Sequence, residues 1–343
     1  MKKNTLKKFS WPRSKNWQTI RNIFLVIFVL INFSKVQTMS QVKIDEKVNY
    51  AGWPNCIKLS NNEIELIVTT DVGPRVIRCG FKGGQNLFKE VKEDLGKVGG
   101  TEWRSYGGHR LWHAPEAMPR TYSPDNSKVQ YKISESSVIL SQAIEPETGI
   151  VKEIEILMDP SKPHVTLRHR LTNKSLWPVE LSAWCLTVMA PGGKAIFPQE
   201  DYRPHPDYLL PARPMVLWHY TDLSDPRYKF SPKYIILKQD PAISKKQKFG
   251  ILNKQGWCAY VLGNDVFVKK FDYDPSASYP DYGCNNETFV NADMLEVETL
   301  GPLVKLEPGS TTEHIEHWYI FKSEIADSDQ SIDQNLVSKI KTQ

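Results

Sequence analysis

The segment Tyr106-Gly-Gly-His-Arg-Leu-Trp-His-Ala-Pro-Glu116 holds the densest group of reactive side chains in the sequence. Two imidazoles, a guanidinium, an indole and a carboxylate follow a glycine pair; they belong to His109, His113, Arg110, Trp112 and Glu116. Imidazole titrates near neutral pH and suits proton transfer. The other three groups suit contacts with a sugar. The segment is therefore a candidate acid–base or sugar-contact site, and the alternative is a hydrogen-bonded structural loop.

The spacing of His109 and His113 would place both imidazoles over one metal ion if the segment were helical. The preceding glycine pair and Pro115 disfavour a helix at this point. We therefore expect no metal site here, and no cofactor.

A second candidate segment is Asn291-Ala-Asp-Met-Leu-Glu-Val-Glu-Thr-Leu-Gly-Pro302. Strand alternation puts Glu296 and Glu298 on one face, opposite Leu295 and Val297. Two carboxylates on one face raise each other's pKa, which favours general-base chemistry. The alternative is a solvated outer face.

Two further segments carry weaker signals. Glu313-His-Ile-Glu-His-Trp-Tyr319 resembles a metal motif, but His314 and His317 fall on opposite strand faces, so we interpret it as a core strand. The stretch from Lys269 to Gly283 is predicted to be a rigid loop, in which Asp281 could contact sugar hydroxyls; a plain turn is the alternative.

Strands must position these groups, because runs of alternating polarity dominate the chain after residue 48. Clear examples lie at residues 63–68, 153–158 and 165–172. The 23 prolines favour turns over helices, and a short amphipathic helix is expected only beyond Ser328. These features predict an all-β antiparallel sandwich over residues 48–323 and a tail at 324–343.

Residues 1–40 contain eight Lys or Arg, no acidic residue and the apolar run Ile23–Ile31. This pattern is typical of a signal peptide or signal anchor, so we expect export to the periplasm or beyond, with membrane contact only through this segment. Subtracting these eight from the 44 Lys and Arg leaves 36 basic against 39 acidic residues, a formal charge of −3. That balance argues against a nucleic-acid partner. The five cysteines form no CxxC pair, and their odd number leaves at least one free thiol unless the chain dimerises through it.

From Asn49 to Lys322 the chain resembles the galactose mutarotase-like (aldose 1-epimerase) superfamily, and most closely an uncharacterised exported bacterial family within it. Asp71–Gly80 with Gly84–Phe88 is similar to the family's opening strands, and Gly107-Gly-His109 to a loop that carries one of its histidines. Leu181-Ser-Ala-Trp-Cys185 resembles the strand with the catalytic acid, and Glu296–Leu300 the strand with the general base.

The resemblance implies an antiparallel supersandwich with a shallow sugar site on a concave face. In the family mechanism a glutamate deprotonates the anomeric hydroxyl and a histidine protonates the ring oxygen. Glu298 matches the base position. Trp184 occupies the acid position, where an indole can only donate a hydrogen bond or stack on a sugar. His109 or His113 would then supply the proton, so we expect these imidazoles and Glu298 to converge on one aromatic-lined hollow.

Three functions remain open. The first is an aldose epimerase-like enzyme that uses Glu298 as base and His109 or His113 as acid. The second is a carbohydrate-binding protein without turnover, and the third is a domain associated with a polysaccharide lyase or hydrolase, in which arginines meet a uronate carboxylate. Each implies a mono- or oligosaccharide ligand, and the candidate contacts are Arg75, Arg110, Trp112, Glu116, Trp184, Glu296 and Asp281.

Overall fold

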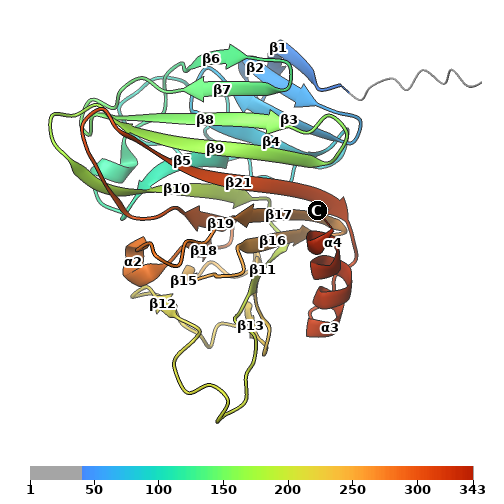
Figure 1. Cartoon of the computed structure of the whole chain (residues 1–343). Coiled ribbons are helices and arrows are strands. Elements are labelled where there is room, and N and C mark those ends of the chain that lie inside the picture. Colours follow the sequence, from blue (N-terminus) through green and yellow to red (C-terminus); the bar gives the residue numbers. More distant parts are fainter. Residues whose placement is uncertain (1–40, 343) are drawn as a thin grey trace, which may run out of the picture. The chain divides into compact units, whose positions relative to one another are not determined.

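The structure, a computed structural model, describes residues 41–342. Within this range the chain folds into two large antiparallel sheets that pack face to face (Figure 1). The prediction of an all-β antiparallel supersandwich is therefore confirmed. Residues 1–40, interpreted above as a signal peptide or signal anchor, lie outside the described residues.

The first sheet has 11 strands within the described range. In spatial order they are β1 Lys43–Tyr50, β2 Trp53–Ser60, β3 Ile64–Thr69, β4 Arg75–Phe81, β5 Gly108–Ala114, β10 Val179–Met189, β19 Leu295–Leu300, β18 Asn286–Val290, β15 Gln247–Ile251 and β12 Met215–Leu217, with β20 Val304–Leu306 paired to β10. This sheet carries most of the candidate residues.

The second sheet has 10 strands within the same range. They are β13 Tyr228–Phe230, β14 Tyr234–Lys238, β11 Lys194–Pro198, β16 Trp257–Leu262, β17 Asp265–Phe271, β21 Thr311–Lys322, β9 His164–Asn173, β8 Ile150–Met158, β7 Ser137–Ser141 and β6 Gln130–Ile133. Short helical turns lie at η1 Arg120–Tyr122 and α2 Pro280–Gly283. The chain ends in the helical run α3 Asp329–Ile332, η2 Asp333–Val337 and α4 Ser338–Lys341.

The main core lies between the inner faces of the two sheets, and strand alternation supplies it. In β9, Val165, Leu167, His169 and Leu171 are buried, while the alternate residues Thr166, Arg168 and Arg170 are partly exposed. In β19, Leu295 and Val297 enter the same core. Glu296 and Glu298 must therefore lie on the outer face of the first sheet, as the sequence predicted.

The outer faces are covered in different ways. The C-terminal helical run packs Ile332, Leu336 and Ile340 against the outer face of the second sheet. On the first sheet, Tyr106 and Leu95 cover β2 to β4. The outer face of β5, β10 and β19 is left for the site described below. Among the described residues, no helix combines the length and apolar character needed to cross a membrane.

Candidate functional site

A hollow of about 830 Å³ lies on the outer face of the first sheet. Its aromatic lining consists of Trp103, Trp112, Trp184, Tyr122, Tyr220 and Phe289. The ring centroid of Trp112 lies 5.4 Å from Trp103, 5.4 Å from Trp184 and 5.0 Å from Tyr122. These edge-to-face contacts build a wall of fixed rings, which is the kind of surface that stacks on the apolar face of a sugar.

Glu298 lies just beneath the surface of this hollow. Its side chain is fully buried, and Trp184 Nε1 donates a hydrogen bond of 2.9 Å to its Oε2. Its Oε1 has no hydrogen-bond partner among the described residues. Burial, aided by the nearby Glu296 carboxylate, raises the pKa of Glu298 to about 7, although Lys248 and the Trp184 hydrogen bond act against this rise. A carboxylate with this pKa suits general-base work near neutral pH.

Lys248 connects Glu298 to a second buried carboxylate. Its Nζ lies 3.0 Å from Glu287 Oε2 and 3.6 Å from Glu298 Oε2. The same ammonium lies 4.7 Å from the ring centroid of Trp184 and 4.6 Å from that of Trp218. Burial alone would lower the pKa of Lys248, but the carboxylates, with Glu298 foremost, outweigh burial and raise it. Lys248 therefore stays charged and lines the hollow as a fixed cation.

Arg110 provides a second fixed cation. Its Nη2 donates to Glu296 Oε1 at 3.1 Å, and its guanidinium lies 4.5 Å from the Trp112 centroid and 5.6 Å from that of Trp103. Only 3% of Arg110 is exposed, yet its Nε and Nη1 have no hydrogen-bond partner among the described residues. Buried donors of this kind are costly to leave unpaired, so a ligand that pairs with them gains affinity.

The prediction that His109 and His113 share the hollow with Glu298 is wrong. β5 starts at Gly108, so the segment is a strand, and alternation sends both histidines to the inner face. His109 Nε2 contacts His169 Nε2 of the other sheet at 2.7 Å, and His113 Nε2 contacts Glu145 Oε2 at 3.3 Å. Burial is the main cause that lowers the pKa of both imidazoles. Neither can serve as an acid for a ligand in the hollow.

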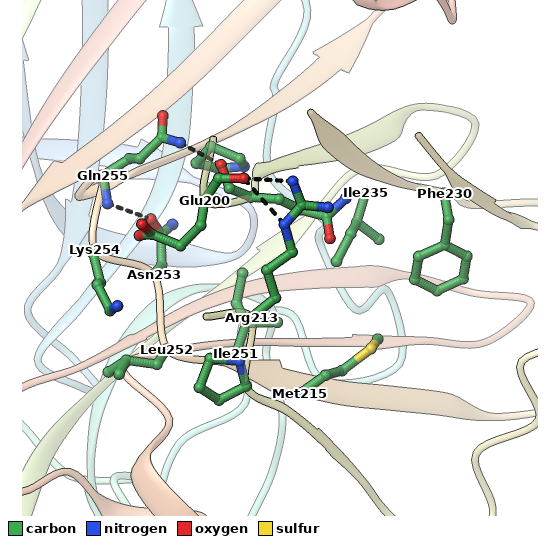
Figure 2. Close-up of a pocket in the computed structure, with 13 residues that line it drawn as sticks. Glu200, Arg213, Met215, Phe230, Ile235, Ile251, Leu252, Asn253, Lys254 and Gln255 are labelled. Carbon is green, nitrogen blue, oxygen red and sulfur yellow. Dashed lines mark hydrogen bonds between the residues drawn. The ribbon is translucent and has the colours of Figure 1, made fainter. Parts of the chain in front are cut away.

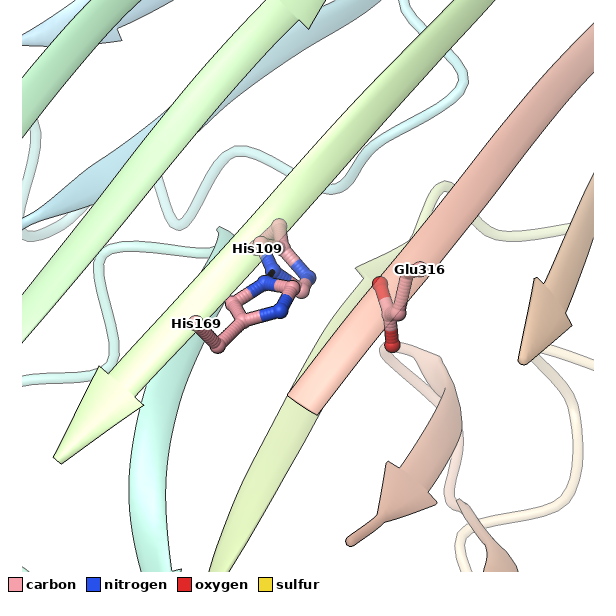
Figure 3. Close-up of side chains that lie close together, drawn as sticks. All are labelled: His109, His169 and Glu316. Carbon is pink, nitrogen blue, oxygen red and sulfur yellow. Dashed lines mark hydrogen bonds between the residues drawn. The ribbon is translucent and has the colours of Figure 1, made fainter. Parts of the chain in front are cut away.

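The inner face instead holds a buried polar cluster in which His109, His169 and Glu316 offer three potential metal ligands within 4.8 Å of one another (Figure 3). Hydrogen bonds already use these atoms. His169 Nδ1 must donate to the carbonyl of His314 at 3.1 Å, so His169 Nε2 accepts from His109 Nε2. Glu316 accepts from Lys269 Nζ at 2.8 Å and Trp318 Nε1 at 2.7 Å. The donor set therefore fits a hydrogen-bonded core network better than a metal site.

Two other predicted contacts lie away from the hollow. Arg75 is fully buried, bonds to Asp125 Oδ2 at 2.6 Å and donates to main-chain carbonyls of Ser105 and Gly107, so it anchors that loop. Asp281 lies in α2 and has a positive φ of 51°. Burial is the main cause that raises the pKa of Glu287, and the charge of Asp281 adds to this rise. By contrast, Arg110, Trp112, Glu116, Trp184 and Glu296 all line the hollow.

Several residues that line or support the hollow have no signal in the sequence that would identify them. Lys248 and Glu287 lie in short strands, and only the pairing of β15 with β18, and of β18 with β19, brings them to Glu298. Glu287 shares its strand face with Phe289, which lines the hollow, but β18 has no alternation of polar and apolar residues that would mark this face in the sequence. Trp103 lies outside regular secondary structure and offered no periodic signal.

A second, smaller pocket of about 90 Å³ lies beside β12 and β15 (Figure 2). Arg213 is the arginine among the residues that line this pocket, and main-chain carbonyls already bind its guanidinium. Its Nη2 donates to the carbonyls of Glu200 at 2.6 Å and Pro232 at 2.8 Å. The larger aromatic hollow is therefore the better candidate site.

Comparisons with solved structures identify the fold. A putative aldose 1-epimerase from Klebsiella pneumoniae matches with a TM-score of 0.58 at 13% identity, covering 87% of each chain. A galactose mutarotase-like protein from Lactobacillus casei matches with a TM-score of 0.52 at 7% identity, covering 78% of this chain and 100% of that one. A TPR-domain containing protein from Parabacteroides distasonis matches with a TM-score of 0.54 at 14% identity; 79% of this chain aligns to 48% of it, so the match spans about half of that protein.

No protein-family model matches the chain, and no curated protein matches it in sequence. The structural likenesses show that the chain has the galactose mutarotase-like fold, as the sequence resemblance predicted.

Proposed function

We propose that this chain is an extracytoplasmic carbohydrate-recognising protein and that the sugar binds in the hollow over β5, β10 and β19. The main support for this proposal is the lining of the hollow, in which packed aromatic rings lie next to fixed charged groups. Concave sites with aromatic walls and a few oriented polar groups are the usual form of small-ligand sites. The likeness to a putative aldose 1-epimerase and to galactose mutarotase-like proteins supports a sugar as the ligand.

Replacing Trp103 by Ala is expected to weaken sugar binding by about 30-fold, or about 2 kcal/mol, which is typical of a central aromatic contact. Trp103 is half-buried and lies on a loop, so its loss should leave the sheets intact. Titration calorimetry with a sugar selected from a glycan array measures the effect. The matched control is Trp177→Ala, which removes an indole that is 75% exposed and outside the hollow. If the two variants bound the sugar with equal affinity, the sugar would have to bind outside the hollow.

A second candidate function is sugar epimerisation, and Glu298 is the observation that favours it. Its pKa near 7, and an Oε1 without a hydrogen-bond partner in the part of the chain that the structure describes, are properties of a general base. Because Glu298 is fully buried, proton transfer needs a bridging water or a shift of Lys248. The proton donor would come from a group that lines the hollow and is protonated at neutral pH, such as Tyr220, whose pKa burial raises to about 12.

The rate of anomer exchange is expected to rise with pH and to level off above about pH 7. Glu298 accepts a proton only in its ionised form, so raising the pH through its pKa increases the active fraction. NMR exchange spectroscopy between pH 5 and pH 9 measures the profile. A rate that falls over this range would exclude Glu298 as the base.

The extracytoplasmic part of the proposal rests on the basic and apolar pattern of residues 1–40. Fractionation of cells that make the full chain tests it, and recovery in the cytosol would contradict it.

A further inference from the structure

One register row crosses the outer face of the first sheet and carries guanidinium groups at one end and carboxyl groups at the other. The strand pairings align the residues of β4, β5, β10, β19 and β18 in the order Arg75, Arg110, Leu186, Glu298 and Glu287. Two guanidinium groups therefore face two carboxyl groups across a single leucine. Neighbouring strands lie about 4.8 Å apart, so the Cα atoms of Arg110 and Glu298 are roughly 10 Å apart.

Leu186 lines the hollow between these two ends and packs with Trp112 and Trp184. A ligand that rests on Leu186 therefore has the aromatic wall beside it. It meets cationic donors toward β5 and a carboxyl group toward β19.

Arg110 is the residue of this row whose N–H groups could bind an anion. Arg75 is already held by Asp125 at 2.6 Å. Within residues 41–342, Arg110 makes one side-chain hydrogen bond, of 3.1 Å to Glu296, and its Nε and Nη1 have no partner. A guanidinium presents its N–H groups in a planar fork that matches a carboxylate. The hydroxymethyl group of a neutral hexose offers one oxygen and no charge, so it would satisfy this donor set poorly.

The charges around the hollow also favour an anionic ligand. Its lining contains the cations of Arg110, Lys245, Lys246 and Lys248 but only the carboxylates of Glu116 and Glu296. Glu287 and Glu298 lie beneath this surface, and burial raises the pKa of both. A cation-rich cleft with aromatic walls concentrates anionic ligands.

We propose that the ligand of this hollow is a uronic acid, with its carboxylate on Arg110, its ring over Leu186 and its anomeric hydroxyl toward Glu298. In a hexuronate the carboxylate and the anomeric hydroxyl are attached to the two carbons that flank the ring oxygen. The carboxylate can therefore point toward one end of the row while the anomeric hydroxyl points toward the other. This inference rests on the proposed function, because it assigns the substrate class of the same site.

The test compares ligands that differ only in the acidic group. Calorimetry is run on D-glucuronate and D-galacturonate, their neutral hexoses and their uncharged uronamides, and also on trigalacturonate against galactotriose. We expect the acids to bind at least about tenfold more tightly than both neutral forms, because charge-assisted hydrogen bonds are about twice as strong as neutral ones. The uronamide comparison needs no protein variant.

The Arg110→Lys variant keeps the charge but loses the fork, so its preference for the acid is expected to fall below about threefold. Arg168→Lys on the exposed outer face of β9 is the control and should keep the full preference. Neutral sugars that bind as tightly as the acids would overturn this inference and leave the proposed function standing. Failure of every sugar, including those of the glycan array, would overturn both.

Discussion

The Glu298→Gln variant is expected to exchange the anomers of a bound sugar about 10²–10⁴-fold more slowly than the wild-type chain, the usual contribution of a positioned general base. The amide has the shape of the carboxyl group and can still accept the hydrogen bond from Trp184 Nε1, but it cannot take a proton. Sugar affinity should change by only a few-fold, because Glu298 lies beneath the lining rather than in it. Exchange spectroscopy and calorimetry on the same preparation separate the two effects.

Glu287→Gln is the matched control for this experiment. Glu287 is the cross-strand partner of Glu298, is equally buried and contacts the same Lys248 ammonium, but lies one strand farther from the centre of the hollow. Its loss should slow exchange by less than tenfold. Equal losses in the two variants would mean that the charge on Lys248, rather than proton transfer at Glu298, controls the rate. A wild-type chain that binds sugar without any exchange would leave recognition as its only activity.

The Glu316→Gln variant is expected to lose about 3–5 kcal/mol of unfolding free energy. Lys269 and Glu316 form a fully buried ion pair at 2.8 Å between the two sheets. Removing the carboxylate charge leaves the ammonium uncompensated in the core. Thr299 donates to Oε1 and Trp318 to Oε2, so the amide, which has a single oxygen, can accept only one of these two hydrogen bonds. Urea denaturation followed by tryptophan fluorescence measures the difference.

Glu313→Gln supplies the comparison on the same strand. Glu313 lies on the exposed face of β21 and contacts Arg168 and Arg170 near solvent. Exposed pairs contribute about 0–1 kcal/mol, so this variant should unfold close to the wild type. A similar small loss for Glu316→Gln would show that the buried network does not stabilise the fold.

The strand content and the faces of the clearest strands could be predicted from local alternation. Leu295 and Val297 point into the core and Glu296 and Glu298 point out, because a two-residue period fixes the face without knowledge of the neighbouring strands. The sequence did not show that the outer face is also buried. Its burial depends on Trp184 and Lys248, which come from distant parts of the chain.

The error over the histidines has a local cause. The pair Gly107 and Gly108 favours a loop, in which alternation does not apply, and such a loop would place His109 and Arg110 in one cluster. Gly108 has a positive φ of 68° but already pairs with Val188 as the first residue of β5, and its missing Cβ allows the main chain of Val76 and Ile77 to approach closely. The side chains of neighbouring residues in this strand therefore point to opposite faces of the sheet.

As a result, one strand supplies two separate polar systems. On the inner face, His109 contacts His169 and His113 contacts Glu145; on the outer face, Arg110 and Trp112 line the hollow. A sequence motif that appears to be one active site is thus divided by the sheet.

A crystal structure of the chain with the tightest-binding sugar from the glycan array would show where the ligand binds. Electron density for a sugar ring is expected over Leu186, against Trp103 and Trp112, with an oxygen of the ligand on Arg110. Density for the sugar on any other surface, with this hollow left open, would contradict the proposed site.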